Sequence, residues 1–416
     1  MTTEAHPGIV TDIGDRFDEY LVALRRELHR TPEVGLHLPK TQKIVLRELT
    51  DIGFDHLSTG TSLSSVVGVI RGRQPGPVVL LRADMDGLPL REQSGLPFAS
   101  TNGAMHACGH DLHMAGLIGA ARLLAARRPS LRGSVVFAFQ PGEEGHGGAP
   151  LMLDEGLLEA AGSPPVASYA VHVWPTIARG VFATRSGPIM AGMNHLRVEI
   201  RGTGGHASSP HRVRDTVPVA AEIVLALQTY VTRRFDVGDP IVLTVTQLAA
   251  DAAAINVIPD RTTLGASVRT LSEHSVARLA AELPDFVERI AAAHGCVAEV
   301  VFSADYPVTV NSEPQTQDAM RILAATFGEY RVSSLASPLM ASEDFAFILQ
   351  RAPGAFILLG ARPDDVDEES PEEPHSPRVR FDDSGLCDHA EALMRLALDG
   401  LASAENPQLE GPAQPL

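Results

Sequence analysis

The sequence predicts an α/β fold in which a smaller α+β domain interrupts a larger one. Strand-like apolar runs alternate with helical periodicity in the first part of the chain, which indicates a sheet covered by helices on both faces. From about residue 194 the order becomes β-α-β-β-α-β, the split βαβ pattern of a four-stranded antiparallel sheet with two helices on one face. Beyond about residue 306 the alternating pattern resumes, so the first domain is discontinuous.

The local patterns place the individual elements. Leu21, Leu24 and Leu28 recur at helical spacing and Pro32 stops the helix that carries them. The other elements expected before residue 188 are strands over 65–71, 78–82 and 134–140 and a helix over 113–127. Those of the insertion are strands over 195–201, 241–249, 261–269 and 297–303 and helices over 215–233 and 272–294. The chain then continues with a helix over 315–329, a strand over 355–360 and a helix over 384–403. The expected domain parts are 1–188, the insertion 189–306, the return 307–404 and a C-terminal tail over 405–416.

Length and charge exclude several classes of protein. The chain has 416 residues, 44% of them hydrophobic, enough for two or three packed domains. Its net charge of −17 would repel phosphate backbones, which disfavours binding to nucleic acid or anionic membranes. The only lysines, Lys40 and Lys43, are expected in a helix of the first domain and lie outside any Gly-Lys-Ser/Thr sequence, so neither a Walker-type nucleotide site nor a Schiff-base lysine is expected.

The sequence disfavours secretion and membrane spanning. No basic cluster precedes an apolar core at the N-terminus, and no stretch approaches 18 uninterrupted apolar residues. Three cysteines, Cys108, Cys296 and Cys387, cannot form an even disulfide framework, which suits a reducing compartment. We therefore expect a cytoplasmic protein.

The densest polar cluster is Met-His-Ala-Cys-Gly-His-Asp-Leu-His at 105–113, with Asp84 and Asp86 upstream. Cys108 and His110 are two residues apart, which in extended or loop backbone turns both side chains to one side, where they could share a metal. The alternative is that Cys108 is a buried small hydrophobe and that the histidines are capping or surface groups.

A pair of carboxylates, Glu143 and Glu144, follows the strand expected over 134–140. Open α/β folds bind their ligands beyond the carboxyl ends of strands. One glutamate there could bind a metal while the other takes a proton. A solvated acidic turn is the alternative.

Two isolated histidines complete the candidates of the first domain. His172 lies in the apolar run 168–174, where a core histidine is the plainer interpretation, and His375 lies in Pro-His-Ser-Pro, where an exposed loop is. One α/β domain could nevertheless bring all these segments to the same sheet edge, and a metal site assembled from separated segments has this pattern.

The inserted domain offers polar groups of another kind. Its glycine-rich turn at 202–207 formally fits G-x-G-x-x-A, but Pro210 interrupts the helix that a dinucleotide site needs, so a close turn presenting His206 fits better. Asn256 and Arg269 supply an amide and a guanidinium suited to a carboxylate. A strand-end turn and a surface ion pair are the alternatives.

Seven ordered motifs together resemble the amidohydrolase branch of the dinuclear metallopeptidase family, which includes aminoacylase, hippurate hydrolase and the indole-acetyl-amino-acid hydrolases. The motifs lie at 24–33, 81–89, 105–113, 139–145, 204–211, 256–260 and 342–346. The resemblance implies a zinc-exopeptidase-like catalytic α/β domain interrupted by a smaller, ferredoxin-like lid domain. It also implies a homodimer or higher homo-oligomer formed through the lid, and a small-molecule substrate.

The resemblance also assigns roles to residues. Five of them fall on metal-ligand positions: Cys108, His110, Glu144, His172 and His375. Glu143 falls on the general base, Asp86 on the aspartate that orients a ligand histidine, and His206 on the lid histidine that polarises the scissile carbonyl, usually from the partner subunit. Substrate-binding positions of the lid are matched by Asn256, Arg269 and His211. Two divalent ions are implied, with zinc, manganese, cobalt and nickel as candidates; the thiolate of Cys108 favours metals softer than manganese.

The expected activity is hydrolysis of the amide bond of N-acyl or aryl-acyl amino acids by metal-activated water, with a glutamate as general base. The alternatives are a dipeptidase-like or other small-amide hydrolase, a hydrolase with Cys108 as nucleophile, and a non-catalytic binding protein. Where the family commonly has a Gly-Gly pair, this chain has Asp-Ala-Ala-Ala-Ile at 251–255, whose methyl groups could narrow the substrate's approach. Seven acids precede His375, at 364, 365, 367, 368, 369, 372 and 373. They predict a solvated loop, and a further hypothesis is that they disfavour substrates with extra negative charge.

Overall fold

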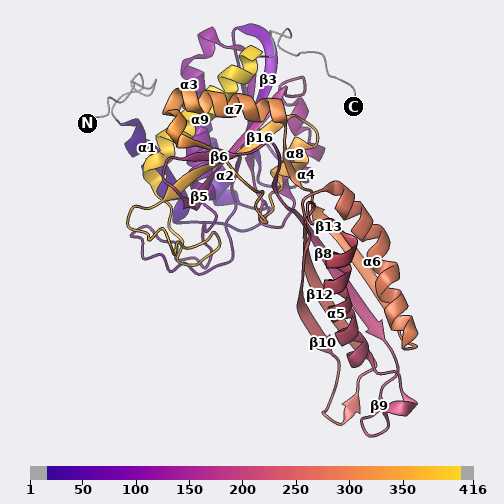
Figure 1. The fold of residues 1–416 in the computed structure, drawn as a ribbon. Coiled ribbons are helices and arrows are strands. Elements are labelled where there is room, and N and C mark those ends of the chain that lie inside the picture. Colours follow the sequence, from indigo (N-terminus) through magenta and orange to yellow (C-terminus); the bar gives the residue numbers. More distant parts are fainter. Residues whose placement is uncertain (1–15, 404–416) are drawn as a thin grey trace, which may run out of the picture. The chain divides into compact units, whose positions relative to one another are not determined.

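A computed structural model describes residues 16–403 and divides the chain into two structural units (Figure 1). Unit 1 contains the chain through Gly187, Val310–Ala336 and the chain from Phe347 onward. Unit 2 contains Pro188–Thr309 and Ser337–Ala346. The tail expected over 405–416 lies outside the described residues.

Unit 1 is built on a mixed eight-stranded sheet. Its strands, in spatial order, are β1 (His56–Thr59), β2 (Val66–Arg71), β4 (Arg132–Gln140), β3 (Gln74–Asp84), β5 (Ala167–Ala178), β16 (Gly354–Arg362), β6 (Phe182–Thr184) and β15 (Val332–Ser334). The four central strands β4, β3, β5 and β16 run parallel, and β2 joins β4 antiparallel. The predicted α/β class is therefore confirmed.

Helices pack around this sheet. They are α1 (Phe17–His29), α2 (Pro39–Ile52), α3 (His110–Ala126), α4 (Gly148–Asp154), α7 (Glu313–Phe327) and α9 (Leu386–Ser403). The leucines that predicted α1 are buried, as expected of an amphipathic helix. Helix α2 contains Lys40 and Lys43 and confirms the helix expected around them; Pro39 opens it and Gly53 closes it with a left-handed φ of 76°.

The central strands are apolar along most of their length because helices cover both faces of a parallel sheet. Val79 and Leu81 of β3 and Phe137 and Phe139 of β4 are fully buried in one cluster. Burying each such side chain contributes roughly 1.5–3 kcal/mol to folding. The ends of these strands, and the residues that follow them, are therefore held in place by the packed core of unit 1.

Unit 2 contains a four-stranded antiparallel sheet and two helices. In spatial order the strands are β10 (Val242–Ala250), β12 (Arg261–Thr270), β8 (Gly192–Arg201) and β13 (Val297–Tyr306), and the helices are α5 (Thr216–Arg234) and α6 (Glu273–Ala293). Alternate residues of β8, such as Leu196 and Val198, pack with Leu227 of α5 and Leu283 of α6. One face of the sheet is thus covered by the helices, in the strand order of a split βαβ arrangement.

Short elements complete the chain. They are β7 (Gly187–Met190), β9 (Gly205–His206), β11 (Val257–Ile258), β14 (Thr309–Asn311) and α8 (Phe345–Leu349). Within residues 16–403, no helix combines the length and apolar character that crossing a membrane requires.

Candidate active site

The candidate residues of unit 1 follow the carboxyl ends of its central strands. Strand β3 ends at Asp84 and β4 at Gln140, so the segments that carry Asp86 and the glutamate pair begin at one edge of the sheet. Helix α3 begins at His110, directly after Gly109, whose φ is 89°. A Cβ on Gly109 would lie 2.4 Å from a methyl carbon of Val173, so glycine is required for the turn that brings the 105–110 segment to this edge.

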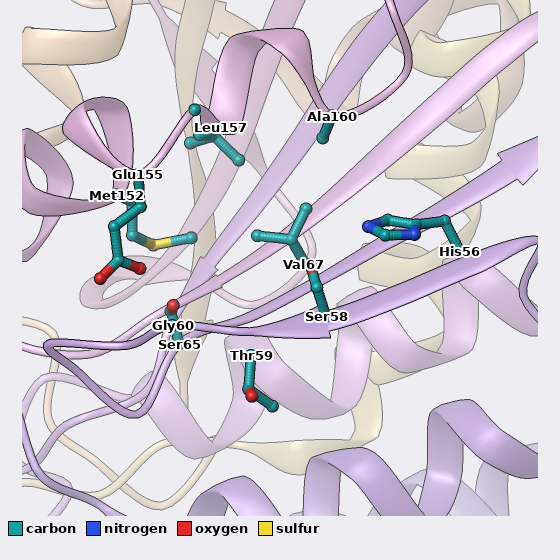
Figure 2. Close-up of a pocket in the computed structure, with 11 residues that line it drawn as sticks. His56, Ser58, Thr59, Gly60, Ser65, Val67, Met152, Glu155, Leu157 and Ala160 are labelled. Atoms are coloured by element: carbon teal, nitrogen blue, oxygen red, sulfur yellow. The ribbon is translucent and has the colours of Figure 1, made fainter.

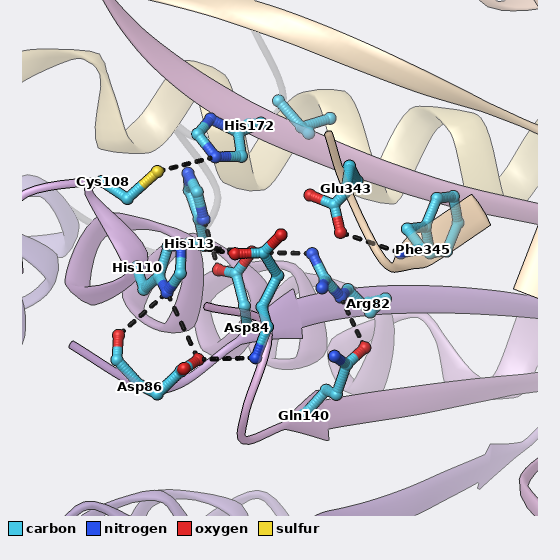
Figure 3. A network of polar contacts seen from close by, with 12 residues as sticks. Arg82, Asp84, Asp86, Cys108, His110, His113, Gln140, His172, Glu343 and Phe345 are labelled. Carbon is cyan, nitrogen blue, oxygen red and sulfur yellow. Dashed lines mark hydrogen bonds and ion pairs between the residues drawn. The ribbon is translucent and has the colours of Figure 1, made fainter. Parts of the chain in front are cut away.

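All five residues on the predicted metal-ligand positions come together here. Donor atoms of Cys108, His110 and Glu144 lie within 4.8 Å of one another. Glu144 Oε1 lies 4.0 Å from His110 Nε2 and 3.3 Å from His375 Nε2. Cys108 Sγ lies 3.5 Å from His172 Nε2 (Figure 3). A soft thiolate, imidazoles and a carboxylate form a donor set suited to transition metals.

Hydrogen bonds fix the tautomers of His110 and His172, the two buried histidines among the ligand candidates. His110 Nδ1 donates to the backbone oxygen of Asp86 at 2.8 Å, and His172 Nδ1 donates to the backbone oxygen of Val173 at 2.7 Å. In its neutral form each ring therefore turns an unprotonated Nε2 toward the cluster, the form that a metal ligand needs. Among the described residues, the buried His110 Nε2 and Glu144 Oε1 have no hydrogen-bond partner. Orphaned acceptors facing one another fit bound cations.

The electrostatics of the cluster also suit a cation. Burial disfavours a charged His110, but the carboxylates of Asp84 and Asp86 outweigh it and raise the pKa of His110 to about 10. Burial, together with the nearby His113, holds the pKa of His172 well below its ordinary value. The carboxylates that favour a proton on His110 would equally favour a divalent ion, which displaces that proton on binding.

Asp86 supports the site in two ways. Its backbone oxygen orients His110, and its carboxylate accepts the backbone N–H groups of Glu143 and Glu144, each at 3.1 Å. Glu143 is 6% exposed, and its Oε2 lies 3.9 Å from His110 Nε2. The two glutamates are thereby held side by side, with the base candidate next to the metal-ligand candidates.

His113 and Asp84 lie beside the ligand candidates but are already occupied (Figure 3). The backbone N–H of Val173 donates to His113 Nε2 at 2.8 Å, so the proton of His113 is on Nδ1, 2.5 Å from Asp84 Oδ1. Arg82 donates to the other oxygen of Asp84 at 2.7 Å. These residues support the ligand candidates through hydrogen bonds. Sequence reasoning did not assign this role, because it depends on the backbone N–H of Val173 on another strand.

A separate hollow of unit 1 does not share this chemistry (Figure 2). It has a volume of about 140 Å³ and lies beside β1 and β2. Oε1 of Glu155, its only carboxylate, accepts hydrogen bonds from the backbone and hydroxyl groups of both Thr61 and Ser62. The Glu155 carboxylate therefore stabilises the loop at Thr61 and Ser62, and among the described residues it is not part of a cluster of candidate metal ligands.

The remaining candidates belong to unit 2 and fall into two places. His206 on β9 pairs with Val257 of β11, directly after Asn256, so these two side chains share one two-stranded ribbon. Both are exposed, as is His211 on the following turn. Strand β12 begins at Arg261, near the ribbon that carries His206, and Arg269 lies close to its other end. At about 3.3 Å per residue, Arg269 is about 26 Å from Arg261. Arg269 donates to Ser342 Oγ at 2.9 Å. Unit 2 therefore does not bring Arg269 to His206.

Comparison with known proteins agrees with this geometry. The model of peptidase family M20/M25/M40 matches residues 80–399. The chain belongs to this family. N-acetylcysteine deacetylase of Bacillus subtilis is 34% identical over 383 residues, covering 92% of this chain and 97% of the relative. An Arabidopsis thaliana IAA-amino acid hydrolase, ILR1-like 4, is 35% identical over 400 residues, covering 94% and 88%.

A solved structure gives the same result for the fold. A Bacillus subtilis protein described as a dinuclear metal-binding peptidase of the M20 family is 31% identical, with a TM-score of 0.81 that covers 94% of this chain and all of that chain. Family membership and the donor set make this M20 enzyme a metal-dependent amidohydrolase whose donor residues are suited to divalent metal ions.

Proposed function

We propose that the enzyme hydrolyses the amide bond joining an acyl or aryl-acyl group to an amino acid, releasing a carboxylic acid and a free amino acid. The observation that carries the proposal is Glu143, a buried carboxylate beside five convergent metal-ligand candidates. The names of the two relatives, a deacetylase of N-acetylcysteine and a hydrolase of IAA-amino acids, support the substrate class.

In the proposed mechanism Glu143 carries both proton transfers. When bound, the two ions supply water activated near neutral pH and an electrophile for the carbonyl oxygen. Glu143 removes a proton from the attacking water as its oxygen bonds to the acyl carbon. Glu143 then delivers that proton to the amide nitrogen while the C–N bond breaks, so the amino acid leaves as a neutral amine rather than as a poor amide anion.

The proposed role of unit 2 is that of a lid acting across a homodimer. His206 polarises the scissile carbonyl, while Asn256, Arg269 and His211 bind the carboxylate of the substrate. The separation of His206 from Arg269 along unit 2 supports this arrangement, because one lid cannot present both groups to one small substrate. The partner subunit would then supply His206, and with it Asn256 and His211, which lie in the same part of unit 2. A cytoplasmic location is part of the same proposal, supported by cysteines at 108, 296 and 387 that form no disulfide.

Two other activities are alternatives to the proposed one. A relative 35% identical to this chain over 352 residues is named thermostable carboxypeptidase 2, from Saccharolobus solfataricus, which makes peptide bonds a second candidate substrate. The 3.5 Å between Cys108 Sγ and His172 Nε2 would also suit a thiolate nucleophile with a histidine base. Only that last chemistry would survive complete removal of metal, and it would be lost on alkylation of Cys108.

A mass-spectrometric substrate screen tests the proposal. The metal-loaded enzyme is incubated with N-acetyl, N-benzoyl, N-indoleacetyl and N-succinyl amino acids, and with dipeptides as a separate set. We expect release of a free amino acid from at least one acyl series, with kcat/KM above that for the dipeptides. Cleavage of dipeptides alone would replace the proposal with a peptidase activity.

A further inference from the structure

His375 is held in an unusual backbone conformation. Its φ of 68° makes it the only non-glycine residue with a positive φ among those the structure describes. The backbone N–H of Ser376 donates to the oxygen of Glu373 at 3.2 Å, which closes a β-turn with Pro374 and His375 at its centre. Proline followed by a residue of positive φ is the pattern of a type II turn, whose third position normally holds glycine or asparagine. Here a histidine occupies it.

This backbone conformation is what directs the ring. The backbone N–H of His375 donates to the oxygen of Ala107 at 3.0 Å, beside Cys108, and His375 Nε2 lies 3.3 Å from Glu144 Oε1. The His375 side chain is 52% exposed, so packing alone does not fix it. A strained residue persists only where its surroundings determine it, and such residues cluster at functional sites.

Contacts of the Glu372 carboxylate fix the conformation of this turn by connecting its two ends. One of its carboxylate oxygens accepts from Ser376 Oγ, and the other accepts from Arg378 Nε at 2.6 Å. The backbone N–H of Arg378 also donates to Ser376 Oγ at 3.2 Å. One carboxylate thus joins the residue before the turn to the last residue of the turn, Ser376, and to Arg378 beyond it, with His375 between them. We call this set of contacts the Glu372 clasp.

We propose that Glu372 is a positioning residue that holds the turn closed and so keeps His375 aimed at the metal centre. The inference rests on the proposed function, in which His375 is a metal ligand. It assigns part of the acidic loop a structural task instead of electrostatic discrimination between substrates.

The ion pairs of the loop agree with this assignment. Asp364 pairs with Arg179 at 3.0 Å, and Asp365 pairs with Arg380 at 2.9 Å. Much of the loop's negative charge is therefore matched by nearby guanidinium groups, which weakens any field that it could present to a substrate. Unlike these acids, Glu372 connects the two sides of the turn that carries His375, because it precedes the turn and its carboxylate accepts from Ser376 and Arg378.

Glu373 provides a matched control. It lies next to Glu372 and closer in sequence to His375, and its contribution to the turn is its backbone oxygen. Glu372→Gln and Glu373→Gln make the same change in charge. Ser376→Ala removes one arm of the clasp without changing charge. Glu372 and Ser376 are only partly buried surface residues, so these variants are expected to fold.

The experiment measures the affinity of each variant for Zn²⁺ by competition with a chromophoric chelator, together with kcat as a function of free Zn²⁺. We expect Glu372→Gln to weaken the lower-affinity Zn²⁺ step about 10-fold to 100-fold, as is typical of residues that support metal ligands. Its kcat should recover in excess Zn²⁺. Ser376→Ala should fall between Glu372→Gln and wild type, and Glu373→Gln should match wild type.

A His375→Ala variant distinguishes a failure of the Glu372 clasp from a failure of the proposed metal-ligand set. If His375→Ala weakens Zn²⁺ binding while Glu372→Gln and Ser376→Ala both match Glu373→Gln, the clasp is wrong and the metal centre stands. Equal weakening by Glu372→Gln and Glu373→Gln, with no effect of Ser376→Ala, would show that charge acts instead of geometry. If His375→Ala binds Zn²⁺ like wild type, the proposed ligand set itself is wrong.

Discussion

The carboxylate of Asp86 accepts a hydrogen bond from the backbone N–H of Glu143 at 3.1 Å, although 57 residues separate the two along the chain. The second oxygen of Asp86 accepts from the backbone N–H of Glu144 at the same distance. One buried carboxylate thus fixes the backbone of both the proposed base and a proposed metal ligand. Its own backbone oxygen meanwhile holds the ring of His110.

Asp86→Asn should therefore damage the site without removing any proposed metal ligand. An asparagine offers one oxygen to two backbone donors, which leaves a buried N–H unsatisfied at a cost of about 1–3 kcal/mol. We expect weaker metal binding and a lower kcat, because both glutamates shift together. Metal titration and steady-state kinetics measure the two effects, and wild-type values for both would contradict the role assigned to this carboxylate.

Glu143→Gln should separate binding from catalysis. The amide keeps the size of the side chain but cannot take a proton from water, so kcat should fall by about 10²-fold to 10⁴-fold while metal stoichiometry is retained. Elemental analysis of the purified variant, next to its kcat, checks both parts. A kcat near that of wild type would remove Glu143 as the general base.

Arg25 and Arg26 allow the contributions of a buried and a more exposed ion pair to stability to be compared. Arg25 Nε lies 2.6 Å from Asp111 Oδ2, and both side chains are almost fully buried, whereas Arg26 is 42% exposed and pairs with Asp383. Arg25→Met would leave Asp111 buried without its strongest partner, at a cost of about 3–5 kcal/mol. Arg26→Met should cost no more than about 1 kcal/mol. Urea unfolding of both variants tests the difference, and equal losses would contradict it.

Stability at low pH should depend on Glu48. Burial alone would raise its pKa, but hydrogen bonds from Tyr20, Arg47 and Arg122 lower the pKa of Glu48 below its ordinary 4.5. A depressed carboxyl pKa stabilises the fold above the unfolded value, and that stability is lost as pH falls through the folded pKa. Between about pH 6 and about pH 3, unfolding free energy should therefore fall less steeply in Glu48→Gln than in wild type. Parallel urea titrations would show equal slopes if the prediction is wrong.

The sequence predicts the large sheet because its central strands are apolar runs bounded by polar segments. It also points to the donor residues, because the carboxyl ends of parallel strands meet at one edge and the chemistry of Cys108, His110 and Glu144 is distinctive. The support that His113 gives the site is missed, because it depends on the backbone N–H of Val173 on another strand. The positive φ of His375 is missed as well, because the Ala107 oxygen that anchors its backbone is remote in sequence.

The most direct test of the account is the turnover of an N-acyl amino acid by enzyme stripped of metal and then titrated with Zn²⁺, Co²⁺, Ni²⁺ or Mn²⁺. The convergence of Cys108, His110, Glu144, His172 and His375 predicts that turnover disappears on stripping and returns as the ions are restored, reaching its maximum with two bound per chain. Hydrolysis that continues undiminished in the fully stripped enzyme would contradict it.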